Sequence, residues 1–411
     1  MPEFLELLPP QQAWEVFRRA LPPESLPGER VPTVQARGRV TAVPVTAGEN
    51  LPAFSRSTVD GYAVQARDTF GASESLPAYL KCTGEVPMGA APAFSIGRGE
   101  CALIHTGGML PDGADAVVML EHTQTSRPGE VEILRAVPEG ENVLLAGEDV
   151  RAGEVVLPAG MRLEDAQIGG LMALGILEVD VVRQPRVGIL SSGDEVIPPE
   201  QSPLSGQVRD VNSYSLSALV ERHGGLAHRY GIVPDRPDAL REFLRRALDE
   251  CDAVIITAGS SASTRDFTAS VINEMGAPGV LVHGVNVKPG KPTILGVCEG
   301  KPVIGLPGNP VSALVIARLF VVPVLHHLLG YSGGRWQPAV RAILTVNLAS
   351  QAGREDYVPV QLIQKDGRVF AEPVFYKSNL IFTLARADGL VKIPSSATGL
   401  GVGEEVEVQL L

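Results

Sequence analysis

The chain has 411 residues, enough for two to four domains, and 45% of them are hydrophobic, which is sufficient for several globular cores. A formal net charge of −12 excludes the broad basic surface that nucleic acids require, although it leaves room for a local basic pocket that binds a small anion. The four cysteines lie far apart without a C-x-x-C pair, so their spacing fits neither a zinc site nor a disulfide framework.

The sequence suggests neither export nor membrane insertion. Its first residues are acidic and interrupted by proline, unlike a signal peptide. The most apolar run, residues 311–329, contains Arg318, Pro323 and two histidines, and this favours a buried helix over a membrane span. We therefore expect a soluble cytoplasmic protein with neither a membrane nor a nucleic-acid partner.

The first 180 residues predict a mixed domain that is interrupted by a β domain. Residues 11–20 and 164–174 have the apolar spacing of amphipathic helices. Between them, short strand patterns alternate with glycine- and proline-rich turns. We expect residues 1–45 and 143–180 to form one split domain in which the two helices pack together, and residues 46–142 to form an inserted β domain.

One turn of the inserted segment carries a candidate site acid. Asp60-Gly61 is a strong turn signal between extended residues, and an aspartate at such a turn usually bonds only its own backbone. Here Ser57 and Thr58 add hydroxyl groups beside the acid, as a ligand site would. Thr106-Gly107-Gly108, at the end of another strand, could also support a ligand but is more typical of a plain turn.

Residues 181–331 predict an α/β domain. Four strand patterns, at 186–190, 226–233, 253–257 and 301–306, alternate with helix patterns at 213–223, 237–249, 264–275 and 311–329. This alternation indicates a parallel sheet with helices on both faces, in which ligands bind at the carboxyl ends of the strands. Loops at that edge bring polar groups, including Glu195, Asp235 and Ser260-Ser261. Asp266 falls in the first turn of a helix, where helix-dipole complementation alone would also explain it.

The stretch from 284 to 312 contains two stiff turns at strand ends. The first is Lys288-Pro289-Gly290-Lys291-Pro292, and the second, Pro307-Gly308-Asn309-Pro310, precedes a helix. Rigid turns with paired cations and helix N–H groups can form an anion pocket. Taken by themselves, the same residues fit two ordinary loops with solvated lysines equally well.

Residues 332–411 return to strand patterns and predict a third, all-β unit of normal domain size. Arg354 precedes one of its strands and Ser378 follows another. The predicted fold class is therefore multidomain, with a central parallel α/β sheet, an inserted β domain and a C-terminal β unit.

Five segments occur here in the order that they have in one family: VDGYAV, SSGDE, TAGSS with RDF, VNVKPGKPT and GLPGNPVS. Over essentially its whole length the chain resembles the molybdopterin molybdenumtransferases, the family that includes the second enzymatic domain of gephyrin. The resemblance implies a C-terminal β-barrel and an elongated homodimer. It also implies an active cleft between the central domain of one subunit and the N-terminal portion of the other.

The activity implied by the resemblance is insertion of molybdate into adenylylated molybdopterin, with release of AMP and formation of the molybdenum cofactor, in the presence of Mg2+. Matched by motif, the functional acids are Asp60, Glu195, Asp235 and Asp266, and we expect the last three to bind the metal because Mg2+ prefers carboxylate and phosphate oxygens. The substrate contacts implied are Ser260, Ser261, Lys288, Lys291, Pro307, Gly308, Asn309, Pro310, Arg354 and Ser378.

The chain departs from the family pattern at two places. Serines replace glycines in the loop before Asp266, and Val59 stands where the family usually has Met. Two other functions fit a related fold. A molybdopterin adenylyltransferase, itself a possible partner, would resemble residues 185–330, consume ATP and need no flanking domains. A non-enzymatic scaffold or receptor on the same dimer would bind adenylylated molybdopterin without releasing AMP.

Overall fold

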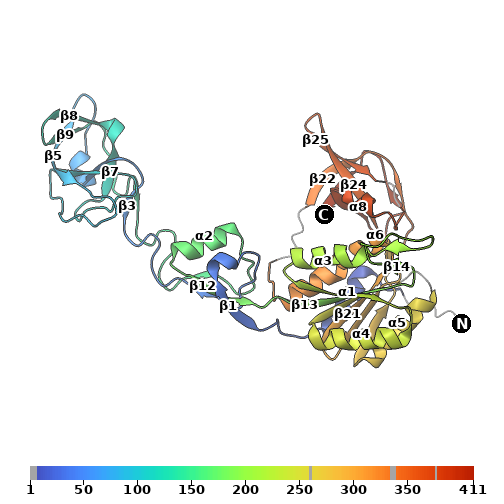
Figure 1. Ribbon diagram of the computed structural model, residues 1–411. Coiled ribbons are helices and arrows are strands. Elements are labelled where there is room, and N and C mark those ends of the chain that lie inside the picture. Colours follow the sequence, from blue (N-terminus) through green and yellow to red (C-terminus); the bar gives the residue numbers. More distant parts are fainter. Residues whose placement is uncertain (1–6, 259–261, 334–338, 375–376) are drawn as a thin grey trace.

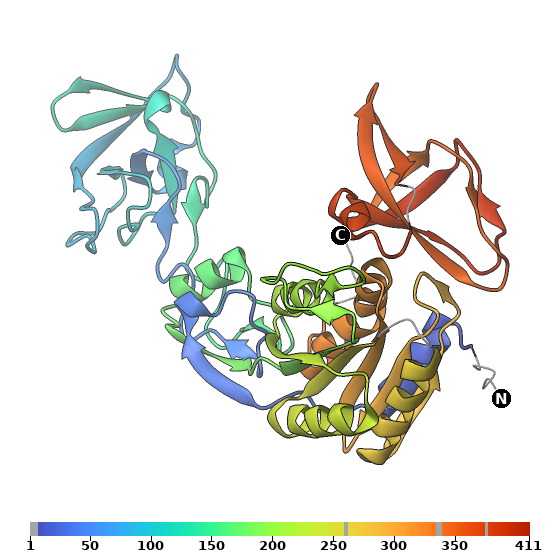
Figure 2. The same cartoon turned by 45° about the vertical axis from the view of Figure 1, so that its right-hand side comes forward.

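The computed structural model describes residues 7–258, 262–333, 339–374 and 377–411, with side chains for all of these except 258 and 262–266. The chain is elongated, with a small β lobe at one end, a central α/β domain, and a β-barrel that stands on the central domain at the other end (Figures 1 and 2). This is the predicted multidomain combination of α/β and all-β units.

The lobe at the far end, here called the inserted lobe, is built on a six-stranded sheet of short strands. Its spatial order is β7 (Ala116–Met119), β4 (Gly61–Val64), β6 (Glu100–Ile104), β5 (Ala78–Glu85), β9 (Glu130–Ile133) and β8 (Thr123–Arg127). Alternate residues of these strands, such as Leu80, Val131 and Ile133, fill its core. At its base β3 (Arg56–Ser57) pairs with β10 (Val143–Leu144). The predicted inserted β fold is present, and its exact boundaries stay predictions.

A narrow linking region joins the lobe to the central domain. In it β1 (Gly28–Pro32) pairs with β12 (Glu178–Val182), and β2 (Val45–Thr46) pairs with β11 (Val155–Leu157). Helix α2 (Asp165–Ala173) begins at a capping box formed by Glu164 and Gln167. Two separate passes of the chain therefore build this region, and the boundaries of the split domain stay predictions.

The N-terminal helix α1 (Pro10–Ala20) packs against the central domain, where Ala13, Trp14 and Phe17 join the core that contains Val282 and Leu295. The prediction that this helix packs with residues 164–174 is wrong. The reason is physical: the aromatic stripe of α1 needs a wide apolar surface, which one face of the central sheet offers, whereas α2 buries only Leu171.

The central sheet has the order β16 (Leu226–Val233), β13 (Arg186–Ser192), β17 (Ala253–Ala258), β21 (Lys301–Pro307), β20 (Ile294–Cys298) and β18 (Pro278–His283). The first four strands run parallel, as predicted, whereas β20 and β18 continue the sheet antiparallel. The predicted helices are confirmed as α3 (Asn212–Arg222), α4 (Pro237–Glu250), α5 (Ala262–Glu274) and a last helical stretch from Pro310 to Leu328. A short pair, β14 (Val196–Ile197) with β15 (Val208–Arg209), extends from the loop after β13.

This last helical stretch consists of α6 (Pro310–Ile316), a π-helical turn η4 (Ala317–Val321) and α7 (Val322–Leu328). It is long and apolar enough to cross a membrane, but 67% of it is buried inside the protein. Phe320 and Leu325 are fully buried in the central core. The stretch is thus a core helix, in agreement with the prediction from its charged and proline residues.

The C-terminal domain is a closed five-stranded barrel of β22 (Ala339–Leu344), β24 (Glu355–Lys365), β25 (Arg368–Pro373), β26 (Gly389–Ile393) and β28 (Glu405–Leu410). Closure follows from the long strand β24, which pairs with β25 along one part and with β26 along another. One strand of the central domain, β19 (Val287–Lys288), joins the barrel by pairing in parallel with Glu355 and Asp356. A short helix, α8 (Ile381–Ala385), precedes β26.

His223, at the end of α3, makes stability depend on pH. Burial, followed by His326 and nearby arginines, lowers the pKa of His223 from 6.5 to about 4. Between these values the unfolded chain binds more protons, so stability falls as the pH drops. Allowing for solvent screening, we expect a loss on the order of 1 kcal/mol, which His223→Gln should abolish. Thermal unfolding at pH 7 and pH 5 measures this, with exposed His228→Gln as the control; equal pH dependence in both variants would contradict it.

Candidate functional site

A cavity of about 1120 Å3 lies where the central domain meets the barrel. The central domain contributes the turn at 286–292 and the loop at 305–309, and the barrel contributes residues 347–356 with Lys377 and Ser378. The cavity thus brings together segments of the central domain and of the barrel that are separated in the sequence. Of the predicted substrate contacts, those that line it are Lys288, Lys291, Pro307, Gly308, Asn309, Arg354 and Ser378.

The lysine turn is rigid because its backbone is fixed from two sides. The amide N–H of Val285 donates to the carbonyl of Lys291 at 2.9 Å, and the Thr293 hydroxyl donates to the carbonyl of Gly290 at 2.7 Å. Gly290 has φ +115° and presses so closely on α6 that a Cβ atom would lie 2.3 Å from Cγ1 of Ile316. Only glycine meets both requirements, so the two lysines are presented by a preformed turn.

Alanine at Gly290 is therefore expected to lower the free energy of unfolding by about 1–3 kcal/mol, because it adds overpacking to a strained backbone. Chemical denaturation measures the loss. Gly300→Ala is the matched control, since Gly300 also has positive φ but meets no atom within 4 Å. Equal losses in the two variants would show that contact with Ile316 contributes nothing.

The loop Pro307–Pro310 is held by its neighbours on both sides. The amide of Asn309 donates to the Ser378 hydroxyl at 2.8 Å, which ties the loop to the barrel, and the amide of Asn212 donates to the carbonyl of Gly308 at 2.7 Å. The N–H of Val311, in the first turn of α6, donates to the carbonyl of Ser378 at 3.1 Å. The Val311 N–H is therefore already hydrogen-bonded within the protein. The side chains around the cavity are the better candidates for holding an anion.

The predicted metal ligands belong to another part of the same domain edge. The Ser192 hydroxyl donates to Asp235, and the N–H of Asp235 donates to Asp194 at 3.2 Å, so the loops after β13 and β16 touch. Glu195 is exposed beside Gly193. In the described part of the chain, Glu195 and Asp235 do not line the cavity, and no three His, Cys, Asp or Glu side chains form a metal cluster.

Three predicted residues lie beyond what the structure describes. Ser260 and Ser261 fall outside the described residues, and Asp266 lies in α5 but its side chain is not among those described. Thr268, two residues further along α5, lines the cavity, so this helix approaches it. The grouping of Glu195, Asp235 and Asp266 around a metal stays a prediction.

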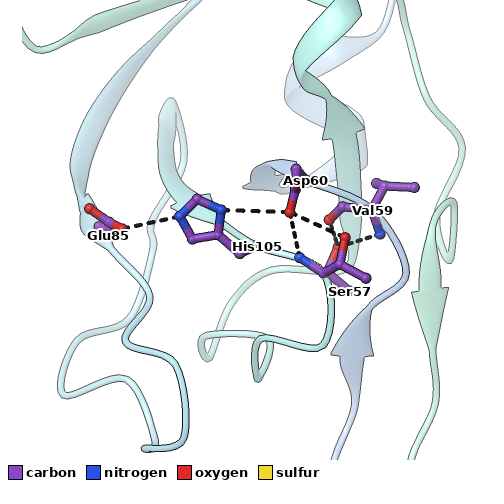
Figure 3. Close-up of polar contacts among 6 residues, drawn as sticks. Ser57, Val59, Asp60, Glu85 and His105 are labelled. Atoms are coloured by element: carbon purple, nitrogen blue, oxygen red, sulfur yellow. Dashed lines mark hydrogen bonds and ion pairs between the residues drawn. The ribbon is translucent and has the colours of Figure 1, made fainter.

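Asp60 lies at the turn between β3 and β4 of the inserted lobe (Figure 3). Its carboxylate accepts hydrogen bonds from the Thr106 backbone N–H at 2.7 Å and the Thr106 hydroxyl at 3.2 Å. The backbone bond is the main reason why the pKa of Asp60 lies below its ordinary value. His105 stands between two acids, with Nδ1 3.6 Å from Asp60 and Nε2 3.1 Å from Glu85. The group is an exposed, ionised carboxylate held in a fixed orientation.

The turn that presents Asp60 requires its glycine. A Cβ atom on Gly61 would lie 1.9 Å from the carbonyl oxygen of Val118, because β4 and β7 approach closely there. Asp60 is thereby fixed on the inserted lobe, while the cavity lies at the other end of the molecule, between the central domain and the barrel (Figures 1 and 2). The structure does not bring Asp60 to the cavity of its own chain.

Two charged residues that line the cavity, Lys377 and Asp356, were not predicted from the sequence. Lys377 stands next to the predicted Ser378, and this adjacency was a usable signal. Asp356 lies inside a strand pattern, and no signal in the sequence marked its burial. In the inserted lobe, the sequence pattern around Thr106 favoured a plain turn, whereas the structure shows that Thr106 orients Asp60.

Three family models match successive parts of the chain. They are the MoeA N-terminal region (domain I and II) at residues 8–175, a probable molybdopterin binding domain at 188–327, and the MoeA C-terminal region (domain IV) at 341–411.

Full-length relatives agree with these matches. A putative molybdopterin biosynthesis protein of Methanocaldococcus jannaschii is 37% identical over 93% of this chain and 92% of its own length. A molybdopterin molybdenumtransferase of Nostoc is 35% identical over 91% and 86%. The crystal structure of the molybdopterin biosynthesis protein MoeA from Pyrococcus horikoshii OT3 superposes with a TM-score of 0.86 at 33% identity, covering 99% of this chain and 100% of its own. The chain therefore belongs to the MoeA family of molybdopterin molybdenumtransferases.

Proposed function

We propose that this enzyme inserts molybdate into adenylylated molybdopterin, releasing AMP and forming the molybdenum cofactor. The observation that carries the proposal is the charge of the cavity. Its described lining contains four cations, Lys288, Lys291, Arg354 and Lys377, and one acid, Asp356, which leaves an excess of three positive charges in a chain whose net charge is −12. A protein this acidic concentrates cations in one cavity where it binds anions.

The chemistry of the reaction requires such a cavity. Molybdate is a dianion and must be held close to a substrate that carries a pyrophosphate, so fixed cations are needed to offset the repulsion. The lysine ammonium groups act as point charges, and the guanidinium of Arg354 can bind two oxygens of one anion. With a volume of about 1120 Å3 the cavity has room for a pterin substrate and an oxyanion together.

The acids at the domain edge supply the ligand chemistry for Mg2+. Asp235 and Glu195 offer hard carboxylate oxygens on two loops that touch, and Asp266 follows on α5. These carboxylates would hold Mg2+, and the chemistry that it would supply there is polarisation of the phosphoanhydride and stabilisation of the departing AMP. Ser192 orients Asp235 through its hydroxyl hydrogen bond.

Asp60 belongs to the same site in a homodimer. Its place on the inserted lobe, away from the cavity of its own chain, supports this proposal, in which a second copy of the chain brings it there. Thr106 holds its carboxylate in a fixed orientation, and we propose that this carboxylate orients the pterin or accepts a dithiolene proton. We further propose that the enzyme acts in the cytoplasm and receives its substrate from the molybdopterin adenylyltransferase.

Incubation with adenylylated molybdopterin, molybdate and Mg2+ tests the function. We expect AMP to be released only when molybdate is present. Tight binding of the substrate without AMP release would favour a scaffold or receptor instead. Consumption of ATP with unmodified molybdopterin would indicate an adenylyltransferase.

A further inference from the structure

Asp356 is a buried carboxylate between the cations of the cavity. Only 3% of the residue is exposed. One of its oxygens accepts a hydrogen bond from Nε of Arg354 at 2.6 Å, and the other accepts one from Nη2 of the same guanidinium at 3.2 Å. Nζ of Lys288 lies 3.9 Å from the second oxygen. One acid thus contacts two of the four cations that line the cavity.

The backbone fixes this carboxylate. Lys288 and Asp356 are direct partners in the parallel pairing of β19 with β24. The Glu355 N–H donates to the carbonyl of Asn286 at 3.2 Å, and the Asn286 side chain donates to the carbonyl of Gly353. Arg354 follows three exposed residues, 351–353, and its long side chain would otherwise sample many rotamers. The pairing with Asp356 removes that freedom.

We propose that Asp356 is a positioning residue for oxyanion binding: it holds the Arg354 guanidinium and the Lys288 ammonium so that their remaining N–H groups face the cavity. A guanidinium has five N–H donors, and Asp356 uses two of them, so three are left for an oxyanion. The inference rests on the proposed use of the cavity as the anion site.

If only its charge mattered, Asp356 would weaken the binding of an oxyanion, which is the opposite of the effect expected of a positioning residue. A carboxylate near a bound oxyanion repels it, so on charge alone Asp356→Asn would tighten molybdate binding. If the acid positions Arg354, the same change weakens binding, because asparagine keeps only one accepting oxygen and its NH2 group cannot accept the second guanidinium N–H bond. The direction of the change therefore separates the two roles.

Calorimetric titration of the full chain with molybdate is the measurement. We expect Asp356→Asn to bind about 10-fold more weakly, since small displacements of a positioned group have effects of this size or larger. In an Arg354→Ala background, Asp356→Asn should lower the molybdate affinity little further, because the guanidinium that Asp356 positions is absent. The matched control is Asp252→Asn, which breaks a similar bidentate pair with Arg183, at 2.8 and 2.6 Å, away from the cavity. This control should lose thermal stability and keep its molybdate affinity.

Arg354→Lys gives a second test that does not alter the buried acid. It keeps the charge but loses the planar fork, so the proposal predicts an affinity close to that of Arg354→Ala rather than of the wild type. Unchanged or tighter binding by Asp356→Asn, or wild-type affinity in Arg354→Lys, would overturn the positioning role. If Arg354→Ala itself binds molybdate normally, the assignment of the anion site fails and the positioning role fails with it.

Discussion

Alanine at Lys291 is expected to lower the affinity for molybdate by about 10- to 100-fold, which corresponds to the loss of one hydrogen bond to a charged group. The side chain is exposed into the cavity on a rigid turn. In the described part of the chain, no acid lies within ion-pair distance of Lys291, whereas Lys288 is 3.9 Å from Asp356. Lys291 can therefore direct its full charge to a ligand, and the molybdate dependence of AMP release measures its contribution.

The matched control for this variant is Lys365→Ala. Lys365 is equally exposed but lies at the hairpin end of β24, outside the cavity. It should leave the molybdate dependence unchanged. If both variants behave alike, the effect is one of overall charge, and Lys291 has no specific role.

Mixing two impaired variants, at a molybdate concentration too low to saturate Lys291→Ala, is expected to restore activity if Asp60 acts on the cavity of a second chain. Asp60→Ala subunits retain an intact cavity, and Lys291→Ala subunits retain an intact lobe acid. In an equal mixture that exchanges freely, half of the dimers are mixed and each of these has one complete site, so about a quarter of the wild-type rate of AMP release should return.

Each variant mixed with itself is the control for this experiment and should keep its own low rate at that molybdate concentration. Analytical ultracentrifugation before mixing establishes that both variants assemble normally. Absence of recovery in samples shown to contain mixed dimers would mean that Asp60 does not complete the site of a partner, and the assignment of this acid would have to be abandoned.

Local patterns predicted the helices and the parallel strands of the central domain, because apolar periodicity and Gly/Pro punctuation act within one segment. They could not predict which surfaces meet. The apolar face of α1 was evident from Trp14 and Phe17. The pattern does not show which surface this face packs against, and the expected contact with α2 was wrong. The antiparallel pairings of β20 with β21 and with β18 also depend on connections that periodicity does not reveal.

The candidate site shows the same limit. Charged turns such as Lys288–Pro292 could be found because their residue types and spacing are local. The burial of Asp356 could not, since an acid at the start of a strand is normally exposed, and here it lies between β19 and β26, which pair with β24 on its two sides. The role of Thr106 likewise depends on a bond across 46 positions of sequence.

The pairing of β19 with β24 also limits which domains of the chain can be exchanged during evolution. A strand of the central domain pairs with β24 of the barrel, and Lys288 and Asp356 are direct partners in this pairing. Exchange of the barrel for an unrelated domain would therefore remove one wall of the cavity and the acid that holds its cations. We therefore expect the central domain and the barrel to evolve together. The inserted lobe is joined through the narrow linking region, so its sequence can change more freely as long as Asp60 keeps its orientation.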